Sequence, residues 1–443
     1  MSKKQKGRDF VFGLGGTGLS IARHLKRIGR DAVFADTREV PPGLEELAEF
    51  WPDAEVLRGN VDLVDDIDRV IVSPGIIDTH PLLAKARARG IDVVSDIELF
   101  AEAADAPYVA ITGSNGKSTV TTLIAHMCEA ADLNVLAGGN LGTPALDLLE
   151  QETPDWYVLE VSSFHLQRTA SLPTDVAVLL NVTPDHLDWH TDFDEYRESK
   201  HRIFDQAKAG VFNREDEDAA ARAAATGSAL SFGAESPAED QFGLSAEDDK
   251  IYLAKGEVLL LDVHELAMVG YHNQLNALAA LAAGQLMQLP MSAMLQVLCE
   301  FPGLPHRMQR VRRLADIDFI NDSKATNVAA AAASIQSIDG MLVLIAGGDG
   351  KGGDFSQLAS ALEGKLRAAV LIGVDAEQIA AALDTVRPVQ FANDMQDAVE
   401  QAAGFAEAGD TVLLAPACAS LDQFNNYMAR GDAFADAARG LRL

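Results

Sequence analysis

The sequence predicts an α/β protein built from parallel β-sheets that are covered by helices on both faces. Short, wholly apolar runs alternate with longer Ala- and Leu-rich runs along almost all of the 443-residue chain. Wholly apolar strands between amphipathic helices are typical of parallel sheets that are buried on both faces. The runs that we expect to form strands include FVFGLG, AVFADT, RVIVSPG, YVAITG, WYVLEVSS, VAVLLNV, MLVLIAGG, AAVLIGV and TVLLAPA.

The strand and helix runs fall into three clusters, which we interpret as three domains. The clusters cover residues 1–95, 96–303 and 304–443. The middle cluster is interrupted near residues 225–262 by a Gly-, Ser- and acid-rich stretch with short apolar runs, and we expect a small side sheet there. The junction FPGLP at residues 301–305 is rich in Pro and Gly, which suits a hinge between the second and third domains.

The composition argues against several classes of function. The chain has 36 basic and 66 acidic residues, and its net charge of -30 would repel nucleic acid and anionic membranes. No apolar run approaches the roughly 20 residues of a membrane-spanning helix, so no membrane insertion is expected. The basic start MSKKQKGR leads straight into a strand-like run, and we interpret it as a frayed terminus rather than a secretory signal. Three separated cysteines without a CxxC pair fit a reduced cytoplasm, and no structural zinc is expected.

The run YVAITGSNGKSTVTTLIAHM has the strand, glycine turn and helix that surround a phosphate-binding loop. In an open parallel sheet, ligands bind beyond the carboxyl ends of the strands, which is where this turn falls. The common pattern would place its first glycine at Ile111, so the match is partial. Gly113 and Gly116 would let the backbone approach phosphates, Lys117 would reach the terminal phosphates and Ser118 would bind Mg²⁺. The alternative is a structural turn without a ligand.

A second glycine pattern follows the first expected strand. Gly13, Gly15 and Gly18 have the spacing G-x-G-x-x-G, and Asp36 ends the next expected strand, as in a dinucleotide-binding fold. The pattern indicates a nucleotide diphosphate without saying which one. The alternative is that these glycines serve only the packing of a helix against a strand.

Other polar side chains follow apolar strands in the middle cluster. Glu160 in WYVLEVSS could bind Mg²⁺ through a carboxylate oxygen, and His186 in LNVTPDHLD could bind a second metal ion. A surface glutamate and a structural histidine are the alternatives. Lys200 in YRESK falls on an expected helix, where a lysine is usually solvated. Cys418 in PACAS has no evident activating histidine, so a thiol nucleophile is not favoured.

Taken in order along the chain, the motifs resemble those of the Mur ligases. GSNGKST is typical of the whole superfamily, which includes the folylpolyglutamate synthases, whereas NDSKATN and PACASLDQF are typical of the member that adds D-glutamate. The phosphate loop of this family is short and begins at Gly113, so Ile111 does not break the pattern. The matching blocks run from residue 13 to about residue 431 and are GLGGTGLS, DTR, SPG, SDIELF, ITGSNGKSTVTTLI, GGNLGTPAL, LEVSSF, LNVTPDHLD, YRESK, HNQLNALAA, GLPHR, NDSKATN, GGDGKGGDF and PACASLDQF.

The resemblance implies a division of labour among three domains. The first would be Rossmann-like and bind the UDP part of the acceptor, the second would be an ATPase, and the third would be Rossmann-like and close over ATP and the amino acid. ATP, UDP-N-acetylmuramoyl-L-alanine and D-glutamate would give an amide, ADP and phosphate, in cytoplasmic peptidoglycan precursor synthesis. A carboxylate must be activated as an acyl phosphate before an amine attacks it, so the protein's task is mainly positioning and charge stabilisation. A monomer is expected.

The resemblance also assigns the ATP and metal sites. Lys117 and Ser118 would hold phosphates and one Mg²⁺, Glu160 would contribute to metal binding, and His186 would help to hold a second Mg²⁺. Lys200 matches a family lysine that carries a carbamate, whose anionic oxygens bind or orient Mg²⁺ where a free ammonium would repel it. The residues expected at ATP are Gly113, Ser114, Asn115, Gly116, Lys117, Ser118, Thr119, Asn273, Asn276, Arg307 and Asp322.

The substrate sites are assigned in the same way. Lys324 and Lys351 would pair with the two carboxylates of glutamate. Three features depart from the family pattern: Tyr427 replaces a phenylalanine, His165 replaces a glutamine near the acceptor, and the segment that leads to Lys200 is slightly shorter. The residues expected at the UDP-linked acceptor are Leu14, Thr17, Asp36, Thr37, Arg38, Ser73, Gly75, Asn140 and Ser162. Those expected at glutamate are Lys324, Thr326, Lys351, Ser420 and Tyr427.

Three other functions stay open at this point. A folylpolyglutamate-type ligase would use the same ATP chemistry on another acceptor. An NAD-dependent dehydrogenase would account for the first glycine pattern and Asp36, but it leaves GSNGKST and NDSKATN unexplained. A nucleotide-binding regulator would bind ATP without forming an amide.

Overall fold

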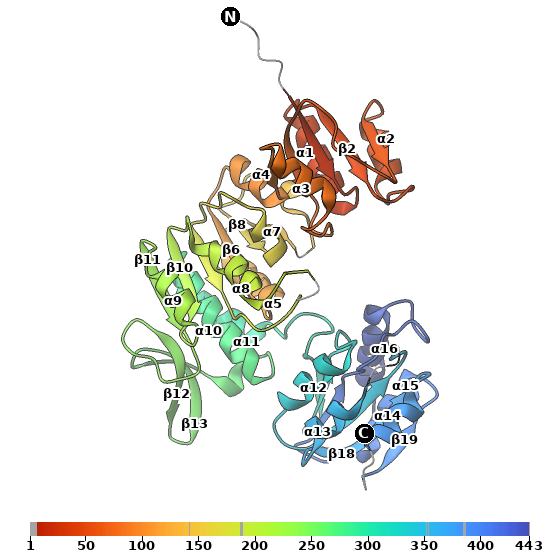
Figure 1. Cartoon of the computed structure of the whole chain (residues 1–443). Coiled ribbons are helices and arrows are strands. Elements are labelled where there is room, and N and C mark those ends of the chain that lie inside the picture. Colours follow the sequence, from red (N-terminus) through yellow and green to blue (C-terminus); the bar gives the residue numbers. More distant parts are fainter. Residues whose placement is uncertain are drawn as a thin grey trace, which may run out of the picture. The chain divides into compact units, whose positions relative to one another are not determined.

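The chain forms three β-sheets whose strands are mostly parallel, so the expected α/β fold class is confirmed (Figure 1). Its contacts divide it into two compact units. The first unit is Met1–Leu260 with Leu275–Val297, and the second unit is Leu261–Gln274 with Leu298–Leu443. The three expected domain boundaries stay a prediction. The computed structural model describes residues 7–140, 142–186, 189–350, 352, 354–383 and 387–442.

The N-terminal sheet is wholly parallel and has the strand order β3-β2-β1-β4-β5. Side chains of a strand point alternately to its two faces, and here Val11 packs into one apolar cluster while Phe10 and Phe12 pack into another. The sheet is therefore buried on both faces, as the apolar runs predicted. Its strands and helices are β1 (Arg8–Phe12), α1 (Gly16–Arg27), β2 (Ala32–Asp36), α2 (Leu44–Phe50), β3 (Glu55–Arg58), β4 (Ile67–Val72), α3 (Pro81–Ala88), β5 (Asp92–Val94) and α4 (Asp96–Ala103).

The central sheet has nine strands in the order β14-β13-β12-β11-β10-β9-β6-β8-β7. The strands are β6 (Tyr108–Thr112), β7 (Val135–Gly139), β8 (Trp156–Glu160), β9 (Val176–Leu179), β10 (Ala209–Asn213), β11 (Ser228–Phe232), β12 (Phe242–Glu247), β13 (Lys250–Lys255) and β14 (Val258–Asp262). The side sheet expected near residues 225–262 is an extension of the central sheet, because β12 pairs with β11 at Phe232 and Phe242. Beyond that point β12 and β13 pair antiparallel.

Helices and short 3-10 turns connect the central strands. The helices α5 and α8 follow β6 and β9, and they begin near the residues expected to bind phosphate and metal. The elements are α5 (Lys117–Ala130), α6 (Ala145–Leu148), α7 (Ser163–Gln167), α8 (Phe193–His201), η1 (Arg202–Phe204), α9 (Glu217–Ala223), η2 (Val263–Glu265), α10 (Tyr271–Leu286) and α11 (Met291–Glu300).

The sheet order brings the candidate loops of the central sheet to one edge. Strands β9, β6, β8 and β7 are consecutive neighbours and pair in parallel, so their carboxyl ends lie together. The phosphate loop follows β6, Glu160 ends β8, Asn140 follows β7 and Asn181 follows β9. Residues that are up to about seventy positions apart in sequence are therefore neighbours at the edge where ligands bind in such sheets.

The C-terminal sheet has the order β15-β16-β20-β17-β18-β19, with β15 antiparallel to β16 and the other pairs parallel. Leu342 and Leu344 of β17 pack into one apolar cluster, and Val343 and Ile345 pack into another, so this sheet is also covered on both faces. Its elements are β15 (Gln309–Leu314), β16 (Ile317–Asn321), α12 (Val328–Gln336), β17 (Leu342–Gly347), α13 (Ser356–Leu362), β18 (Leu366–Ile372), α14 (Ala376–Leu383), β19 (Val389–Phe391), α15 (Met395–Phe405), β20 (Thr411–Leu414) and α16 (Tyr427–Gly440).

Within the first unit, a buried arginine at the end of α7 holds a loop of the N-terminal sheet. The side chain of Arg168 is 1% exposed, and its Nε donates to Asp78 Oδ1 at 3.0 Å. Its Nη2 donates to the carbonyl oxygen of Ile76 at 2.5 Å. Its guanidinium carbon lies 5.5 Å from the ring centre of Trp189, which is a cation–π contact. This one side chain thus contacts the loop after β4 and the segment after β9.

None of the helices within the described ranges is both long and apolar enough to span a lipid bilayer.

We predict that Gly347→Ala destabilises the second unit by about 3 kcal/mol or more. Gly347 has φ +125°, and an added Cβ would lie 1.8 Å from the carbonyl oxygen of Ile372, so both backbone strain and a clash oppose the change. Gly404→Ala is the matched control, because Gly404 lies in α15 with no atom near its added Cβ. The control should stabilise by about 0.5–1 kcal/mol. Urea unfolding measures both, and equal effects would contradict the prediction.

We also predict that Arg168→Met lowers the free energy of unfolding by about 1–3 kcal/mol, because it leaves the partly buried Asp78 carboxylate without its buried partner. Arg87→Met provides the comparison. Arg87 donates to the same oxygen of Asp78 at 2.7 Å, but its side chain is 44% exposed. An exposed pair contributes about 1 kcal/mol or less. A larger loss in the Arg87 variant than in the Arg168 variant, seen by urea unfolding, would refute this account of Arg168.

Candidate active site

The phosphate loop of the first unit requires glycine at its last turn. Gly116 is the N-cap of α5 and has φ +85°, in the left-handed region that favours glycine. A Cβ added there would lie 2.3 Å from Asn276 Oδ1. The loop therefore brings the start of α5 against Asn276, one of the residues expected at ATP. The backbone N–H groups that begin this 14-residue helix form the kind of end at which phosphates bind.

Two lysines share one carbonyl oxygen in this loop. Lys117 Nζ donates to the carbonyl oxygens of Gly113 at 2.8 Å and of Ser114 at 3.0 Å, and Lys200 Nζ donates to the same Gly113 oxygen at 2.8 Å. Lys200 is only 1% exposed. Its burial, reinforced by the charge of Lys117, lowers the pKa of Lys200 well below its ordinary value. The structure thus brings together two expected catalytic residues that are 83 positions apart in sequence.

Hydrogen bonds from the neighbouring loop hold the phosphate loop in shape. Ser114 Oγ donates to the carbonyl oxygen of Thr183 at 2.9 Å, and it lies 2.8 Å from the hydroxyl of Tyr196. The amide nitrogen of Asn115 donates to Asn181 Oδ1 at 2.9 Å, and Asn181 Nδ2 donates back to the carbonyl oxygen of Asn115 at 3.0 Å. The loop is therefore held by protein contacts alone, before any phosphate binds.

Sequence reasoning missed the two partners Asn181 and Tyr196. Asn181 is a polar residue directly after an apolar strand, and that position was a usable signal. Tyr196 carries no such signal, because it falls inside α8 among polar residues. Ser118 and Thr119 lie half-buried in the first turn of α5, as the motif suggests.

Glu160 has a buried oxygen to which none of the described residues donates a hydrogen bond. Its Oε1 accepts a hydrogen bond from Asn140 Nδ2 at 2.6 Å, whereas its Oε2 has no hydrogen-bond partner, and the residue is 2% exposed. A buried carboxylate oxygen without a donor is costly, and a bound cation would offset that cost. The chemistry of Glu160 therefore fits a hard cation such as Mg²⁺.

His186 lies at the surface of the same edge. It has φ +53°, its side chain is 47% exposed, and its Nε2 lies 3.6 Å from Asp185 Oδ2. Its ring packs edge-on against Phe164, with ring centres 4.9 Å apart. Among the side chains that the structure describes, no group of three His, Cys, Asp or Glu residues is arranged to hold a metal ion. A site here would need further oxygen donors.

In the N-terminal sheet, both carboxylate oxygens of Asp36 accept hydrogen bonds from neighbouring protein groups. Its Oδ1 accepts from the amide nitrogen and the Nε of Arg38 at 2.9 and 2.8 Å, and its Oδ2 accepts from the amide nitrogen of Leu14 at 2.8 Å and from Arg38 Nη2 at 2.7 Å. Burial opposes ionisation, but these donors together lower the pKa of Asp36 to about 2. A carboxylate has about four acceptor positions, so Asp36 keeps none for a ribose hydroxyl.

The other residues expected at the acceptor surround this loop. Ser73 Oγ donates to the carbonyl oxygen of Gly13 at 2.8 Å, and Gly13 has φ +101°. Asp36 and Ser73 thus hold the glycine turn from its two sides. Thr17 is half-buried, whereas Thr37, Arg38 and Gly75 are exposed.

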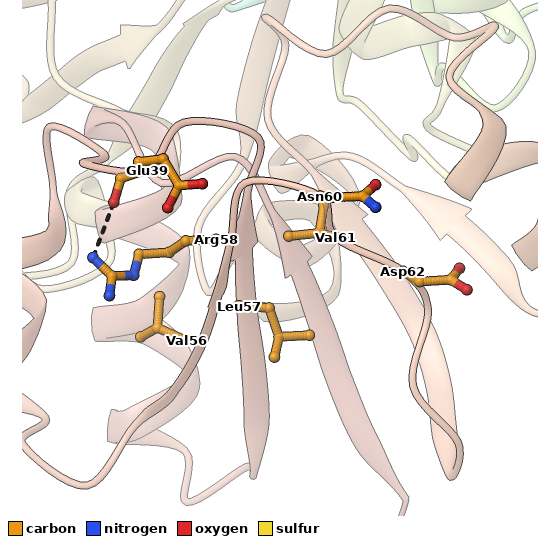
Figure 2. Close-up of a pocket in the computed structure, with 7 residues that line it drawn as sticks. All are labelled: Glu39, Val56, Leu57, Arg58, Asn60, Val61 and Asp62. Atoms are coloured by element: carbon orange, nitrogen blue, oxygen red, sulfur yellow. Dashed lines mark hydrogen bonds between the residues drawn. The ribbon is translucent and has the colours of Figure 1, made fainter.

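A pocket lies along β3 and the segment after it, next to the turn that carries Arg38 (Figure 2). Its volume is about 360 Å³, and Figure 2 shows Glu39 and Arg58 at one side of it and Asn60 and Asp62 at the other. Arg58 Nη1 donates to the carbonyl oxygen of Glu39 at 2.9 Å. None of the residues expected at the acceptor lines this pocket. The lining residues are Glu39, Val56, Leu57, Arg58, Asn60, Val61 and Asp62.

A second pocket of about 500 Å³ borders the loop that supports the phosphate loop. Asn181 and Thr183 form one wall, and the four consecutive carboxylates from Glu215 to Asp218 form another. The acidic wall makes this pocket a poor place for a phosphate.

In the second unit, the residues expected at glutamate follow neighbouring strands. Lys324 and Thr326 follow β16, Ser420 follows β20, and Tyr427 begins α16. Lys324 Nζ lies 4.4 Å from the ring centre of Tyr427, so the aromatic ring holds the ammonium group. Lys351, the other expected partner of a glutamate carboxylate, lies outside the described residues.

The residues of the second unit expected at ATP differ in burial. Asp322 is 7% exposed, accepts from the amide nitrogen of Met308 at 3.1 Å and is hydrogen-bonded by Ser334 Oγ. Burial raises the pKa of Asp322 above its ordinary value. Asn273 is also buried, and its Nδ2 donates to the carbonyl oxygen of Val269 at 2.7 Å. Arg307 is exposed.

A buried arginine that sequence reasoning missed ties the loops of the second unit together. Arg430 is 1% exposed and donates to the hydroxyl and carbonyl oxygens of Ser323 and to the carbonyl oxygens of Gly347 and Cys418. Burial lowers its pKa to about 10, so it stays charged at neutral pH. Burial also raises the pKa of Cys418 to about 12, which fits the expectation that this thiol is no nucleophile. In the sequence, Arg430 is an ordinary residue of a helix.

Family models match three stretches of the chain. A model described as Mur ligase MurD-like, N-terminal domain, matches residues 7–95. The Mur ligase middle domain matches residues 111–284, and the Mur ligase, glutamate ligase domain matches residues 306–418. Together the three stretches contain the glycine turn, the phosphate loop and the buried loops of the second unit.

Similar proteins cover the chain almost completely. A UDP-N-acetylmuramoylalanine–D-glutamate ligase of Legionella pneumophila is 46% identical over 97% of this chain and 98% of its own length. One of Pseudomonas syringae pv. syringae is 49% identical over 97% of each. A solved UDP-N-acetylmuramoyl-L-alanyl-D-glutamate–2,6-diaminopimelate ligase shares the fold, with a TM-score of 0.61 at 18% identity over 99% of this chain and 94% of that one. With this identity, extended over nearly the full length, the chain belongs to the Mur ligase family.

Proposed function

We propose that this protein is an ATP-dependent ligase that joins D-glutamate to UDP-N-acetylmuramoyl-L-alanine in the synthesis of peptidoglycan precursors. The observation that carries the proposal is the phosphate loop, where Lys117 and Lys200 converge on the carbonyl oxygen of Gly113 at the start of α5. Relatives that are 46–49% identical over nearly the whole chain carry the name of this activity. The enzyme is proposed to act in the cytoplasm as a monomer.

The reaction proceeds in two balanced steps. The acceptor carboxylate attacks the terminal phosphorus of ATP, which forms an acyl phosphate and breaks the bond to ADP. The amine of D-glutamate, after losing its extra proton, then attacks the acyl carbon, and inorganic phosphate leaves as the amide forms. Lys117 and the amides that begin α5 stabilise the charge that moves onto the phosphate oxygens. The protein needs no covalent role, so positioning supplies most of the rate.

Two Mg²⁺ ions are proposed at the edge of the central sheet. Bound Mg²⁺ would neutralise phosphate charge in a protein whose own net charge is -30. Glu160 Oε2, which lacks a protein partner, and the hydroxyl of Ser118 would hold one ion. His186, exposed next to the phosphate loop, would help to hold the other, and phosphate oxygens would complete both sites.

Lys200 is proposed to carry a carbamate. A neutral amine adds to CO₂ with loss of one proton, so a lysine reacts only when it is uncharged. The burial of Lys200 and its closeness to Lys117 favour the neutral amine. The carbamate is an anion, so it attracts the Lys117 ammonium group that a charged Lys200 would repel. Its oxygens would orient Mg²⁺.

The substrates are proposed to divide among three domains with boundaries at residues 1–95, 96–303 and 304–443. The UDP part would bind the glycine turn that Asp36 and Ser73 shape. Glutamate would bind near Lys324, whose ammonium group lies over the ring of Tyr427. Asp36 would shape the site through Leu14 and Arg38 instead of binding ribose, which also argues against a dehydrogenase.

The central test is phosphate release from ATP with the UDP-linked acceptor and either D- or L-glutamate. We predict release and amide formation with D-glutamate, and little of either with L-glutamate or with a folate acceptor. Lys117→Ala should abolish release, while its affinity for the UDP-linked acceptor should stay within about twofold of wild type, because the UDP part would bind the N-terminal sheet and Lys117 is not among the residues expected at the acceptor. Turnover of a folate acceptor would favour the folylpolyglutamate-type alternative. ATP binding without any amide would favour a regulator.

Removal of CO₂ tests the modified lysine. Enzyme freed of bicarbonate should lose most of its activity and regain it when bicarbonate is restored. Lys200→Ala should be nearly inactive in both conditions, with partial recovery when a short carboxylic acid is added. Lys208→Ala is the control, because the side chain of Lys208 is 70% exposed and pairs with Asp175 away from the phosphate loop. A Lys200→Ala enzyme that keeps its rate would exclude the carbamate.

A further inference from the structure

We infer that His165 is a positioning residue that fixes the hydroxyl of Ser162 as a hydrogen-bond acceptor, so that Ser162 binds an amide N–H of the acceptor substrate and not an anionic oxygen. The inference rests on the proposed function for the identity of the substrate, and on hydrogen-bond geometry for the direction of the hydroxyl. Nothing in the sequence indicated a direct bond between these two side chains.

The ring of His165 is held in one tautomer by the backbone. The amide nitrogen of Ser162 lies 3.2 Å from His165 Nδ1 and can only donate, so Nδ1 must present its lone pair. The proton of the neutral ring is therefore on Nε2. That atom lies 3.4 Å from Oδ1 of Asp96, a buried oxygen to which none of the described residues donates a hydrogen bond, so a proton on Nε2 lies near a carboxylate oxygen. In the opposite tautomer, the Nδ1–H of His165 would point at the amide N–H of Ser162, and two donors would face each other.

This tautomer decides where the hydroxyl proton of Ser162 points. Ser162 Oγ lies 2.7 Å from His165 Nδ1, which has no proton to donate, so the hydroxyl donates there and shares the single lone pair of Nδ1 with the amide N–H of Ser162. The same oxygen accepts the amide N–H of His165 at 3.3 Å, as the N-cap of α7. A hydroxyl has one proton and two lone pairs. Ser162 Oγ therefore has one unused lone pair, because its proton is donated to His165 and its other lone pair accepts the amide N–H of His165.

The Ser162 oxygen that carries the remaining lone pair lies at the same edge of the central sheet as Glu160. Ser162 follows Glu160 by two residues in extended backbone, and side chains two apart in such a segment share one face. The acceptor substrate has amide N–H groups in its acetyl and alanyl parts, and these match a lone-pair acceptor. The carboxylate and phosphate oxygens of the acceptor substrate carry only lone pairs, so they would be repelled by the lone pair of Ser162 Oγ. Ser162 would thus select the amide and leave the anions to lysines and Mg²⁺.

The first test reads the tautomer directly, without substrate. Long-range ¹H–¹⁵N NMR of the full chain distinguishes a protonated from an unprotonated imidazole nitrogen. The His165 signals are those missing from the spectrum of His165→Gln. We expect an unprotonated Nδ1 and a protonated Nε2 at neutral pH. A protonated Nδ1 would overturn the inference, whether or not the enzyme makes the proposed amide.

The second test separates positioning from folding. Glutamine can accept both donors of Ser162 with its Oε1 and face Asp96 with its amide, whereas leucine can do neither. We therefore expect His165→Gln to bind the UDP-linked acceptor within about threefold of wild type, and His165→Leu and Ser162→Ala to bind it about tenfold more weakly in calorimetry without ATP. The KM for ATP should change less than about twofold in all three.

The double variant completes the test. His165→Leu with Ser162→Ala should bind the acceptor no more weakly than Ser162→Ala alone, because His165 acts only through Ser162. Additive losses would overturn the inference, and so would wild-type affinity in His165→Leu. A rise in the Mg²⁺ requirement without loss of acceptor affinity would show that Ser162 faces a cation instead. If no variant, wild type included, binds the acceptor, the proposed function fails while the NMR result still stands.

Discussion

The candidate site depends on the carbonyl oxygen of Gly113, which accepts hydrogen bonds from Lys117 and Lys200 together. Two ammonium groups at one buried oxygen repel each other, so the arrangement is stable only if one of them loses its charge or an anion arrives. The lowered pKa of Lys200 reflects the first response. The phosphates of ATP and a carbamate would supply the second. The loop is thus prepared for negative charge in a protein that is itself strongly negative.

Buried polar groups prepare the other parts of the molecule in the same way. Asp36 fills all its acceptor positions with protein donors and so shapes the glycine turn before a nucleotide binds. Arg430 joins the carboxyl ends of three strands of the second unit by donating to the carbonyl oxygens of Ser323, Gly347 and Cys418. Glu160 Oε2 is the counterexample, because it is a buried oxygen to which none of the described residues donates a hydrogen bond. Polar groups whose hydrogen bonds are all made within the protein set the geometry of the loops. Polar groups with an unused acceptor position are the candidates for binding a ligand.

Much of the fold could be predicted because strands, helices and glycine turns each have a characteristic pattern of residues close together in the sequence. Apolar runs of strand length predicted the mostly parallel sheets, and glycines before a helix predicted the phosphate loop. The side sheet was predicted as a separate element, but it is continuous with the central sheet through Phe232 and Phe242. That pairing joins strands across a long polar segment, and no local pattern encodes it. Tyr196 and Arg430 escaped notice for the same reason, since their roles come from partners far along the chain, whereas the position of Asn181 after an apolar strand was a usable signal.

The sequence alone determined the fold class, the loop at Gly113 to Thr119 and, through its motifs, the family, because these depend on residue types at short, fixed spacings. Only the tertiary structure decided that Lys117 and Lys200 share one oxygen, that Asp36 has no acceptor position left, and that His165 directs the proton of Ser162. Hydrogen-bond direction and burial are properties of atoms brought together by folding. The sequence shows which chemical groups are present. Only the packed structure shows which of their lone pairs and protons are not already used in hydrogen bonds within the protein and can therefore bind a substrate.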